Sequence, residues 1–373
     1  MIAPLDPAAW AVVAVAGAAA GRLVLALAMP FVTVDEDGRP VGLRAGGGRT
    51  VTIVAVLCAL ALWWWEVVAG GQLPVPLGDA AARGPLVVRY AAHVTLFALL
   101  AAASWVDLRH RVIPDTITMP GVLVGLAWVT LAPAALLPIA VEVPRSFAEP
   151  LVEPDLLGLA GGLRTALPAW LHPRPSWTGL VAALAAYVGW WRGCTAPFTD
   201  PARSAGVRDP RTLALPAGIV GIAAAWWIGG LAWNGLLSGL AGLVVAAAMI
   251  WLTRAGASRA LGREAMGFGD VTLMAMVGSW LGWQACVLTC FIAVFVGLVH
   301  GGLQVLFHRE TELPFGPSLC LGAAAVVVAW RPLWARAAAS FERPLEMAAV
   351  IAAVIGLTAV SLMVWRRLRP SLG

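Results

Sequence analysis

The sequence contains no lysine, and only 12% of its 373 residues are charged. A soluble domain carries about 25% charged residues, so this composition excludes an ordinary soluble protein. Because 60% of the residues are hydrophobic, we predict an all-α, polytopic membrane helix bundle with about 9–11 transmembrane helices. The lack of lysine also excludes a serine–lysine catalytic dyad.

Motifs that bind zinc are absent as well. The sequence has no H-E-x-x-H motif, and its five cysteines form no C-x-x-C pair. Most of these cysteines lie inside apolar runs, where a thiol behaves as a small hydrophobic group. Cys286 and Cys290 are one helical turn apart, and we expect them to pack in the core. We therefore expect neither a metal site nor a cofactor.

The net charge of +5 is carried by arginine. Arginine-rich loops near a membrane mark its cytoplasmic side, so we expect no nucleic-acid partner. If the N-terminus lies outside the cell membrane and the C-terminus in the cytoplasm, most of the arginines fall on the cytoplasmic side of the membrane. Arg331 and Arg336 do not fit this arrangement. The arginines that fit lie within residues 39–49, 109–111, 192–211, 254–263 and 366–369.

Apolar runs of about 20 residues predict the membrane-spanning helices. In one of them, Gly235 and Gly239 form a G-x-x-x-G pattern that is expected to serve helix packing. The candidate helices cover residues 8–30, 51–69, 86–106, 117–140, 177–191, 211–229, 233–252, 271–283, 285–306, 317–335 and 346–365.

We expect four regions along the chain. They are N-terminal helices with a short cytoplasmic loop (1–85), helices around a first aspartate (86–134), an insertion with an outer loop and extra helices (135–230), and the C-terminal helices (231–373). Within the insertion, residues 141–176 are rich in proline and are expected to form an irregular external loop.

Two short polar islands interrupt the apolar sequence, and each places an aspartate at the edge of an apolar run. Residues 106–115 contain Asp107, and residues 263–270 contain Asp270. An ionisable residue at membrane depth is costly, so it usually has a function. The predicted topology brings both carboxylates to one membrane face. Two adjacent carboxylates share one proton, so one can take a proton from water while the other protonates a peptide carbonyl.

The residues around Asp270 allow a catalytic and a structural interpretation. Gly267 and Gly269 permit backbone conformations closed to other residues and let another chain approach closely, as an extended peptide substrate requires. In the structural alternative, Asp270 is the N-cap of a helix, and Asp107 is an interfacial loop residue beside basic neighbours.

Three further polar residues lie in apolar surroundings. Arg89 and His93 share one helical face, one turn apart, and we expect buried pairing or snorkelling rather than catalysis. Glu66 follows the run Trp63–Trp65 and is expected to be solvated near an outer interface.

Three segments resemble bacterial type IV prepilin peptidases. The segment from Asp107 to Gly121 resembles the first catalytic segment of that family. The segment from Gly262 to Gly282 resembles its G-x-G-D segment and the following helix, and residues 313–317, LPFGP, resemble its P-F-G-P turn. The resemblance implies that Asp107 and Asp270 are the catalytic dyad, supported by the family landmarks Asp115, Glu264, Gly267, Gly269, Pro314, Phe315, Gly316 and Pro317.

This resemblance implies an intramembrane aspartic endopeptidase that removes basic leader peptides from type IV prepilin or pseudopilin precursors. Cleavage is expected after a glycine that precedes the hydrophobic pilin helix. The resemblance also implies a multi-pass protein of the bacterial inner membrane, in contact with membrane lipid and with its active site facing the cytoplasm. The oligomeric state does not follow from the sequence.

The sequence departs from the family in its N-terminal region. Bifunctional members carry a domain with two zinc-binding C-x-x-C pairs after the first helix, whereas loop 31–50 has no cysteine or histidine. The family's Gly-Ser-Phe-Leu-Asn stretch aligns near residues 21–25, where the asparagine is missing, and Thr272 stands where the family often has lysine. The resemblance therefore does not extend to N-methyltransferase activity.

Two other functions are compatible with this composition. A catalytically inactive member of the family could serve as a scaffold in a pilus or secretion apparatus, although the intact aspartates argue against that role. A proton-coupled transporter would favour aspartates at the bilayer midplane and an internal repeat, and the sequence shows neither.

Overall fold

The computed structural model describes residues 6–31, 47–73, 84–138, 175–195, 210–308, 314–341 and 344–368. These residues form helices and turns without any strand, which confirms the predicted all-α class. Leu313, most of loop 31–50 and most of the stretch 141–176 lie outside the described residues. The long helices are α1 (Pro7–Ala28), α2 (Gly47–Trp63), α3 (Gly84–His110), α4 (Asp115–Leu131), α6 (Trp177–Thr195), α7 (Pro210–Ile228), α8 (Gly230–Leu261), α9 (Phe268–Leu281), α10 (Trp283–His308), α11 (Gly316–Val328), α12 (Trp330–Phe341) and α13 (Pro344–Leu368).

Three short helical segments join them. They are η1 (Met29–Phe31), the π-helical turn η2 (Trp64–Val68) and η3 (Pro133–Ala135). The segment 117–140, expected to be one helix, ends earlier, because Ala132 leaves the helical conformation just before Pro133.

The helices form a multi-pass membrane bundle. Four described segments are long and apolar enough to cross a membrane: Pro7–Phe31, Gly47–Val68, Gly84–His110 and Gly230–Leu261. A fifth span results if α11 and α12 are taken together, although their axes are bent by 94°. Shorter apolar stretches of 10–17 residues lie in α4, α7, α9, α10 and α13.

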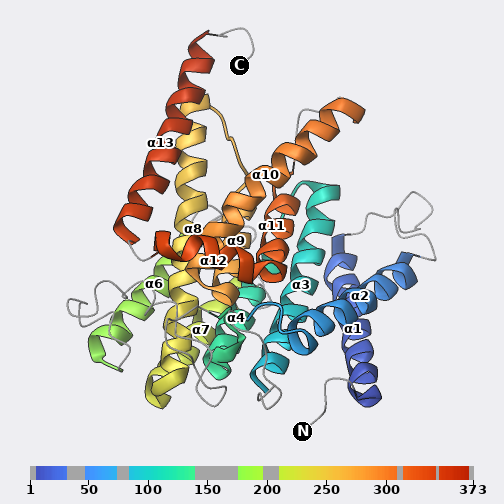
Figure 1. Cartoon of the computed structure of the whole chain (residues 1–373). Helices are drawn as coiled ribbons and strands as arrows, with labels where there is room; N and C mark the ends of the chain where they lie inside the picture. Colours follow the sequence, from blue (N-terminus) through green and yellow to red (C-terminus); the bar gives the residue numbers. More distant parts are fainter. Residues whose placement is uncertain are drawn as a thin grey trace.

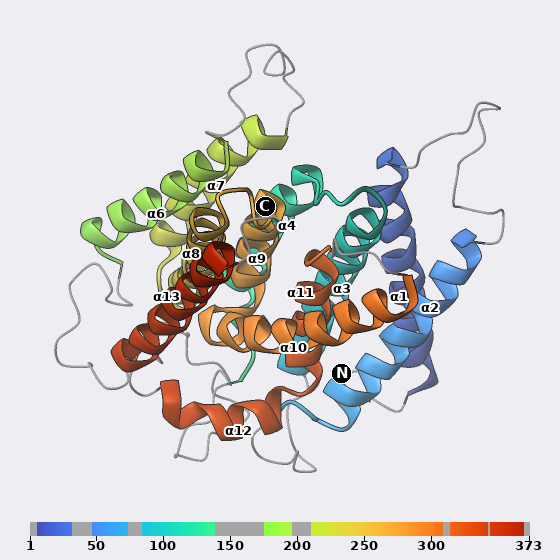
Figure 2. The same cartoon turned by 90° about the horizontal axis from the view of Figure 1, so that it is seen from above.

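Two pairs of helices flank the centre of the bundle (Figures 1 and 2). α1 and α2 pack on one side, where a Cβ added to Gly17 would lie only 2.8 Å from Val56 Cα. α6 and α7 lie on the opposite side, and α3, α4, α9 and α11 lie between the two pairs. α13 runs along α8 (Figure 1).

The short helix α9 is the centre of the packing. All its residues from Asp270 to Leu281 are buried, as expected for a helix that is apolar on every face. α8 approaches α9 so closely that a Cβ added to Gly242 would lie 2.8 Å from Gly282 Cα. The absence of a side chain at Gly242 allows this approach. Gly239 packs on Val129 of α4 in the same way, which confirms the packing role of the G-x-x-x-G pattern.

The segment 317–335, expected to be one helix, is two helices in the structure. In a continuous helix, residue 332 would donate its N–H to the carbonyl of Val328, but proline has no N–H. That carbonyl accepts a hydrogen bond from Trp65 Nε1 instead, at 2.8 Å. The break after α11 is therefore compensated by a side chain from η2.

After this break, α12 runs across one side of the bundle (Figures 1 and 2). It buries Trp330 and Trp334, whose rings stack at 5.1 Å, and exposes Arg331 and Arg336. The two arginines therefore belong to an amphipathic crossing helix rather than to a loop, which explains why they did not fit the predicted loop topology.

Candidate active site

Asp107 lies in the last turn of α3, and its side chain is only 5% exposed. The helix continues to His110, and Arg111 follows in the left-handed conformation with φ 54°. The backbone N–H of Gly316, the first residue of α11, donates a hydrogen bond to the Asp107 carboxylate. Asp107 is therefore a buried helical residue at the N-terminus of a second helix, and not the interfacial loop residue of the structural alternative.

Asp270 lies in the first turn of α9 and is 7% exposed. The N-cap position of α9 is occupied by Gly267, and no side chain caps this helix. Asp270 is thus not the N-cap that the structural alternative required. Asp107 and Asp270 lie close enough for their charges to interact. The structure therefore brings the two predicted aspartates together from helices that are far apart in the sequence.

Two glycines allow this approach. A Cβ added to Gly316 would overlap the Asp107 carboxylate, and it would lie 2.8 Å from Ile113 Cδ1. A Cβ added to Gly269 would lie 2.8 Å from Ile113 Cβ. Both positions require glycine because of close packing, and Ile113 fills the space between them.

The conformational reason expected for the glycines before Asp270 is wrong. Gly267 has φ −64° and ψ 150°, which any residue can adopt, and Gly269 is not among the described residues with positive φ. Gly267 is exposed, and the nearest atoms to an added Cβ are Asp270 Oδ2 and Gly269 N, both at 4.0 Å. Gly267 is therefore an exposed position next to the Asp270 carboxylate.

Ser104 and Cys320 form the next layer around the aspartates. Their side chains hydrogen-bond to each other across α3 and α11, and Cys320 lies near both Asp107 and Asp270. Cys320 is 5% exposed. Neither residue was predicted for the site, and neither was Ile113. Their proximity depends on the packing of α11 against α3, which leaves no local pattern in the sequence.

The remaining predicted site residues surround these helices. Asp115 is the first residue of α4 and is half-buried. Pro314 and Phe315 are half-buried and lead into α11, where Pro317 occupies the first turn, a position that needs no N–H donor. Glu264 is exposed and lies between α8 and α9.

The polar island before α9 is held against α8. Arg254 Nε donates to the carbonyl of Met266 at 2.9 Å, and its guanidinium pairs with Glu264. One turn further along α8, the hydroxyl of Ser258 accepts a hydrogen bond from the N–H of Ala265 at 3.1 Å. The segment before Asp270 is therefore anchored at three consecutive residues.

The arrangement supports acid–base chemistry by two carboxylates. Burial of Asp270 and its repulsion by Asp107 both disfavour a state in which the two carboxylates are ionised together. Among the described residues, no group of three or more histidine, cysteine, aspartate or glutamate side chains is placed to hold a metal ion.

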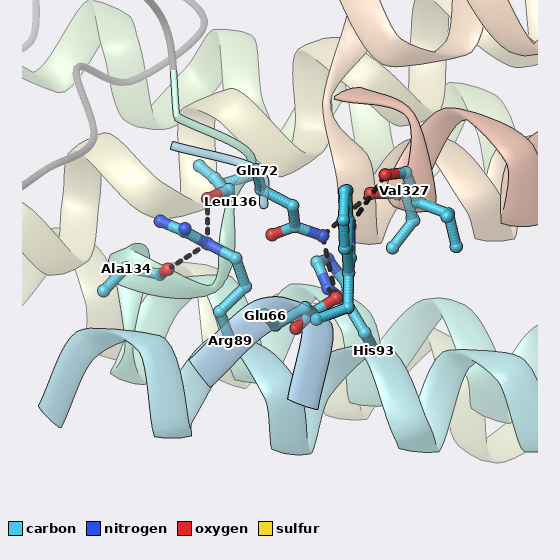
Figure 3. Close-up of polar contacts among 9 residues, drawn as sticks. Glu66, Gln72, Arg89, His93, Ala134, Leu136 and Val327 are labelled. Carbon is cyan, nitrogen blue, oxygen red and sulfur yellow. Dashed lines mark hydrogen bonds and ion pairs between the residues drawn. The ribbon is translucent and has the colours of Figure 1, made fainter. Parts of the chain in front are cut away.

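A second buried polar cluster lies at the other end of α3 (Figure 3). Glu66 of η2 is 1% exposed, so the expectation of a solvated glutamate is wrong. Its Oε1 accepts a hydrogen bond from Gln72 Nε2 at 2.7 Å and lies 2.7 Å from His93 Nδ1. Gln72 Nε2 also donates to the carbonyl of Val327, near the end of α11, at 2.8 Å. The cluster therefore ties η2 to both α3 and α11.

Arg89 and His93 are both buried and paired, as expected, but with different partners. Arg89 Nε donates to the carbonyls of Ala134 and Leu136, at 3.2 and 3.1 Å (Figure 3). His93 is 14 residues from Asp107 along α3, a distance of about 21 Å at 1.5 Å per residue. The cluster is thus separate from the aspartate pair.

Residues 207–302 match a family model described as the type IV leader peptidase family. This match covers about a quarter of the chain, from α7 into α10, and includes Asp270 but not Asp107. It begins inside the segment 135–230 that was expected to be an insertion, so the family model includes α7. No solved structure matches the chain.

Curated relatives give the same result. A prepilin leader peptidase/N-methyltransferase of Aeromonas salmonicida is 34% identical over 26% of this chain and 33% of its own length. Proteins of the same name from Stutzerimonas stutzeri (40% identity, 18% of this chain, 25% of the relative) and Dickeya chrysanthemi (37%, 26% and 40%) are also similar. The matches thus span about a quarter to two-fifths of these relatives. The comparisons confirm the resemblance to type IV prepilin peptidases.

Proposed function

We propose that this chain is an intramembrane aspartic endopeptidase that cleaves basic leader peptides from type IV prepilin or pseudopilin precursors. The observation that carries this proposal is the convergence of two buried carboxylates, Asp107 of α3 and Asp270 of α9, at the N-terminus of α11. The match of residues 207–302, which include Asp270, to the type IV leader peptidase family and the similarity of part of the chain to prepilin leader peptidases support the choice of substrate.

The chemistry needs only the shared proton of the pair. One carboxylate takes a proton from a water molecule, whose oxygen attacks the peptide carbonyl, while the other carboxyl protonates the carbonyl oxygen. The tetrahedral intermediate then loses the C–N bond as a proton passes to the departing nitrogen. The N–H of Gly316 stabilises the negative form of Asp107, because a helix N-terminus favours an anion.

The exposed position of Gly267 next to Asp270 Oδ2 supports an approach of the substrate from this side. An extended peptide could lie over this glycine, with its hydrophobic helix in the bilayer and its basic leader at the polar islands. This places the cleaved bond at the membrane surface, and we propose the cytoplasmic face of the inner membrane, where the arginine-rich segments are expected.

A cleavage assay with the purified protein in lipid nanodiscs tests this function. The substrate is a prepilin-like precursor with a basic leader, a glycine and a hydrophobic helix, and a precursor with the glycine replaced by a bulky residue is the control. We expect a single cut after the glycine in the first precursor and none in the second. An uncut precursor, or equal cleavage of both, would contradict the proposal.

A further inference from the structure

The segment from Glu264 to Phe268 carries several contacts to one residue of α8. Arg254 Nε donates to the Met266 carbonyl, its Nη2 pairs with Glu264, and its guanidinium lies 5.6 Å from the centre of the Phe268 ring. Phe268 is the first residue of α9, and Asp270 follows two residues later. Arg254 thus contacts the chain at three positions just before the candidate catalytic aspartate.

We propose that Arg254 is a positioning residue, which fixes the start of α9 and so sets the place of the Asp270 carboxylate beside Asp107. This inference rests on the proposed function. Arg254 makes its contacts with Glu264, Met266 and Phe268 and not with either aspartate, so its effect must pass through the backbone of residues 264–268. An arginine suits this task because its planar fork can bind a carbonyl and a carboxylate at once.

The hydrogen bond to Met266 is the more important of the two polar contacts. Glu264 is 65% exposed and Arg254 25% exposed in their ion pair, so water and salt screen that attraction. The Met266 carbonyl lies just before the N-cap residue of α9 and takes no part in the backbone hydrogen bonds of that helix. Its hydrogen bond with Arg254 is partly buried and sets the direction in which the chain enters α9.

Ser258 supports the same segment from the same face of α8. It is four residues after Arg254, and its hydroxyl accepts the N–H of Ala265. Gly262, with φ 72°, turns the chain back after α8 and allows both residues to reach the segment. The docking of residues 264–268 on α8 therefore has two independent anchors.

The test measures kcat, KM and the thermal midpoint of variants in nanodiscs, with the precursor used above. Arg254→Met keeps the aliphatic chain and loses both donors, and we expect kcat to fall about tenfold while KM changes less than about twofold, because a displaced catalytic group slows chemistry rather than binding. In Arg254→Lys, which keeps one charged donor, we expect kcat to fall about two- to threefold. Glu264→Gln should lose less than about twofold, as an exposed ion pair is weak.

The matched control is Arg259→Gln. Arg259 is an exposed arginine five residues further along α8, and its replacement removes the same positive charge from the same end of the helix. We expect wild-type kcat and KM. Ser258→Ala, a smaller change, should lower kcat about twofold and keeps the inference testable if Arg254→Met fails to accumulate.

Three results would overturn this role. An unchanged kcat in Arg254→Met, or in Ser258→Ala where Arg254→Met does not fold, would show that the anchors do not position Asp270. A raised KM with intact kcat would make Arg254 a substrate contact instead. If Arg259→Gln lost as much kcat as Arg254→Met, the loss would be explained by the removal of a positive charge from this end of α8 and not by positioning. If the wild-type protein itself cleaves no precursor, the proposed function fails, and the role of Arg254 fails with it.

Discussion

The two aspartates receive different support from their surroundings. Asp107 accepts a backbone N–H from Gly316, whereas Asp270 is held by the placement of the first turn of α9. Both are almost completely buried, so neither carboxylate is present merely to make the surface soluble. In the proposed mechanism, this difference between their environments would let one member of the pair keep the charge while the other keeps the proton.

Replacing either aspartate by asparagine should abolish processing. Asparagine keeps the shape but cannot exchange a proton, so we expect Asp107→Asn and Asp270→Asn each to lower kcat by about 100-fold or more. Asp115→Asn should lower kcat by less than about tenfold, because the proposed mechanism uses only the carboxylates of Asp107 and Asp270. Processing of the precursor in membranes is the measurement, with protein level checked by immunoblot. Full activity of either dyad variant would end the proposed mechanism.

Gly316→Ala tests the close packing at Asp107. The added methyl group would overlap the Asp107 carboxylate, so α11 or the carboxylate must move. We expect kcat to fall about 10- to 100-fold, since small displacements of a reacting group are costly. Gly356→Ala on α13 is the matched control, because no atom lies within 4 Å of the added Cβ there. Equal activity of the two variants would show that the Gly316 contact is unimportant.

The candidate dyad could be predicted from single residues, but its surroundings could not. Asp107 and Asp270 stand out because a carboxylate in an apolar chain is costly and therefore rare. Ile113, Ser104 and Cys320 are ordinary residues for a membrane helix or its edge, and only the tertiary packing gives them a place near the dyad. Sequence reasoning therefore finds the carboxylates, whose burial costs free energy, and misses the apolar and small polar residues that position them.

Among the elements, helix existence was easier to predict than helix ends. The long apolar runs correctly predicted α1 and α3 at nearly their observed positions, since a long apolar run needs burial whatever its partners are. α8 was also predicted, but it continues to Leu261 instead of ending at residue 252, so Arg254 and Arg259 lie in a helix and not in the expected loop. The bend at Ala329 was missed because the apolar pattern continues through Trp330 and Trp334. Glu66 was predicted to be solvated because its partners, Gln72 and His93, approach it only in the folded chain.

The cluster around Glu66 explains how the bend can be stable. Without an N–H from Pro332, the carbonyls that end α11 need other donors, and Trp65 and Gln72 provide them. An unpaired carbonyl in this setting would cost several kcal/mol, so these side chains take the place of missing helical hydrogen bonds. Glu66 and His93 in turn hold Gln72 at the required position.

Breaking the Glu66–His93 pair should destabilise the bundle. We expect Glu66→Leu to lower the unfolding free energy by about 3–5 kcal/mol, since it leaves buried polar partners uncompensated. The double variant Glu66→Leu, His93→Leu should lose less than the sum of the two single variants, because it removes both partners together. Reversible unfolding in detergent mixtures measures all four proteins. Strictly additive losses would show that the two side chains act independently.

At the scale of the whole molecule, α11 is held at both of its ends, by α3 at the first and by the segment around η2 at the second. Near the aspartates, Gly316 contacts Asp107, and about 16 Å along α11 Gln72 contacts Val327. The N-terminal helices, through η2, therefore help to hold the helix whose first residue faces the candidate catalytic aspartate. These contacts give the N-terminal helices a structural role in holding α11.

The last prediction concerns the product after cleavage. Loop 31–50 contains no cysteine or histidine, and the asparagine expected near Leu25 is missing, so little is present to hold a methyl donor beside the new amine. We therefore expect the mature pilin to keep an unmodified N-terminal amine. Intact-mass analysis after incubation with the purified protein and S-adenosylmethionine measures this, and cleavage without the methyl donor is the control. A gain of one methyl group would show that another part of the chain, such as residues 192–211, supplies the methyltransferase site.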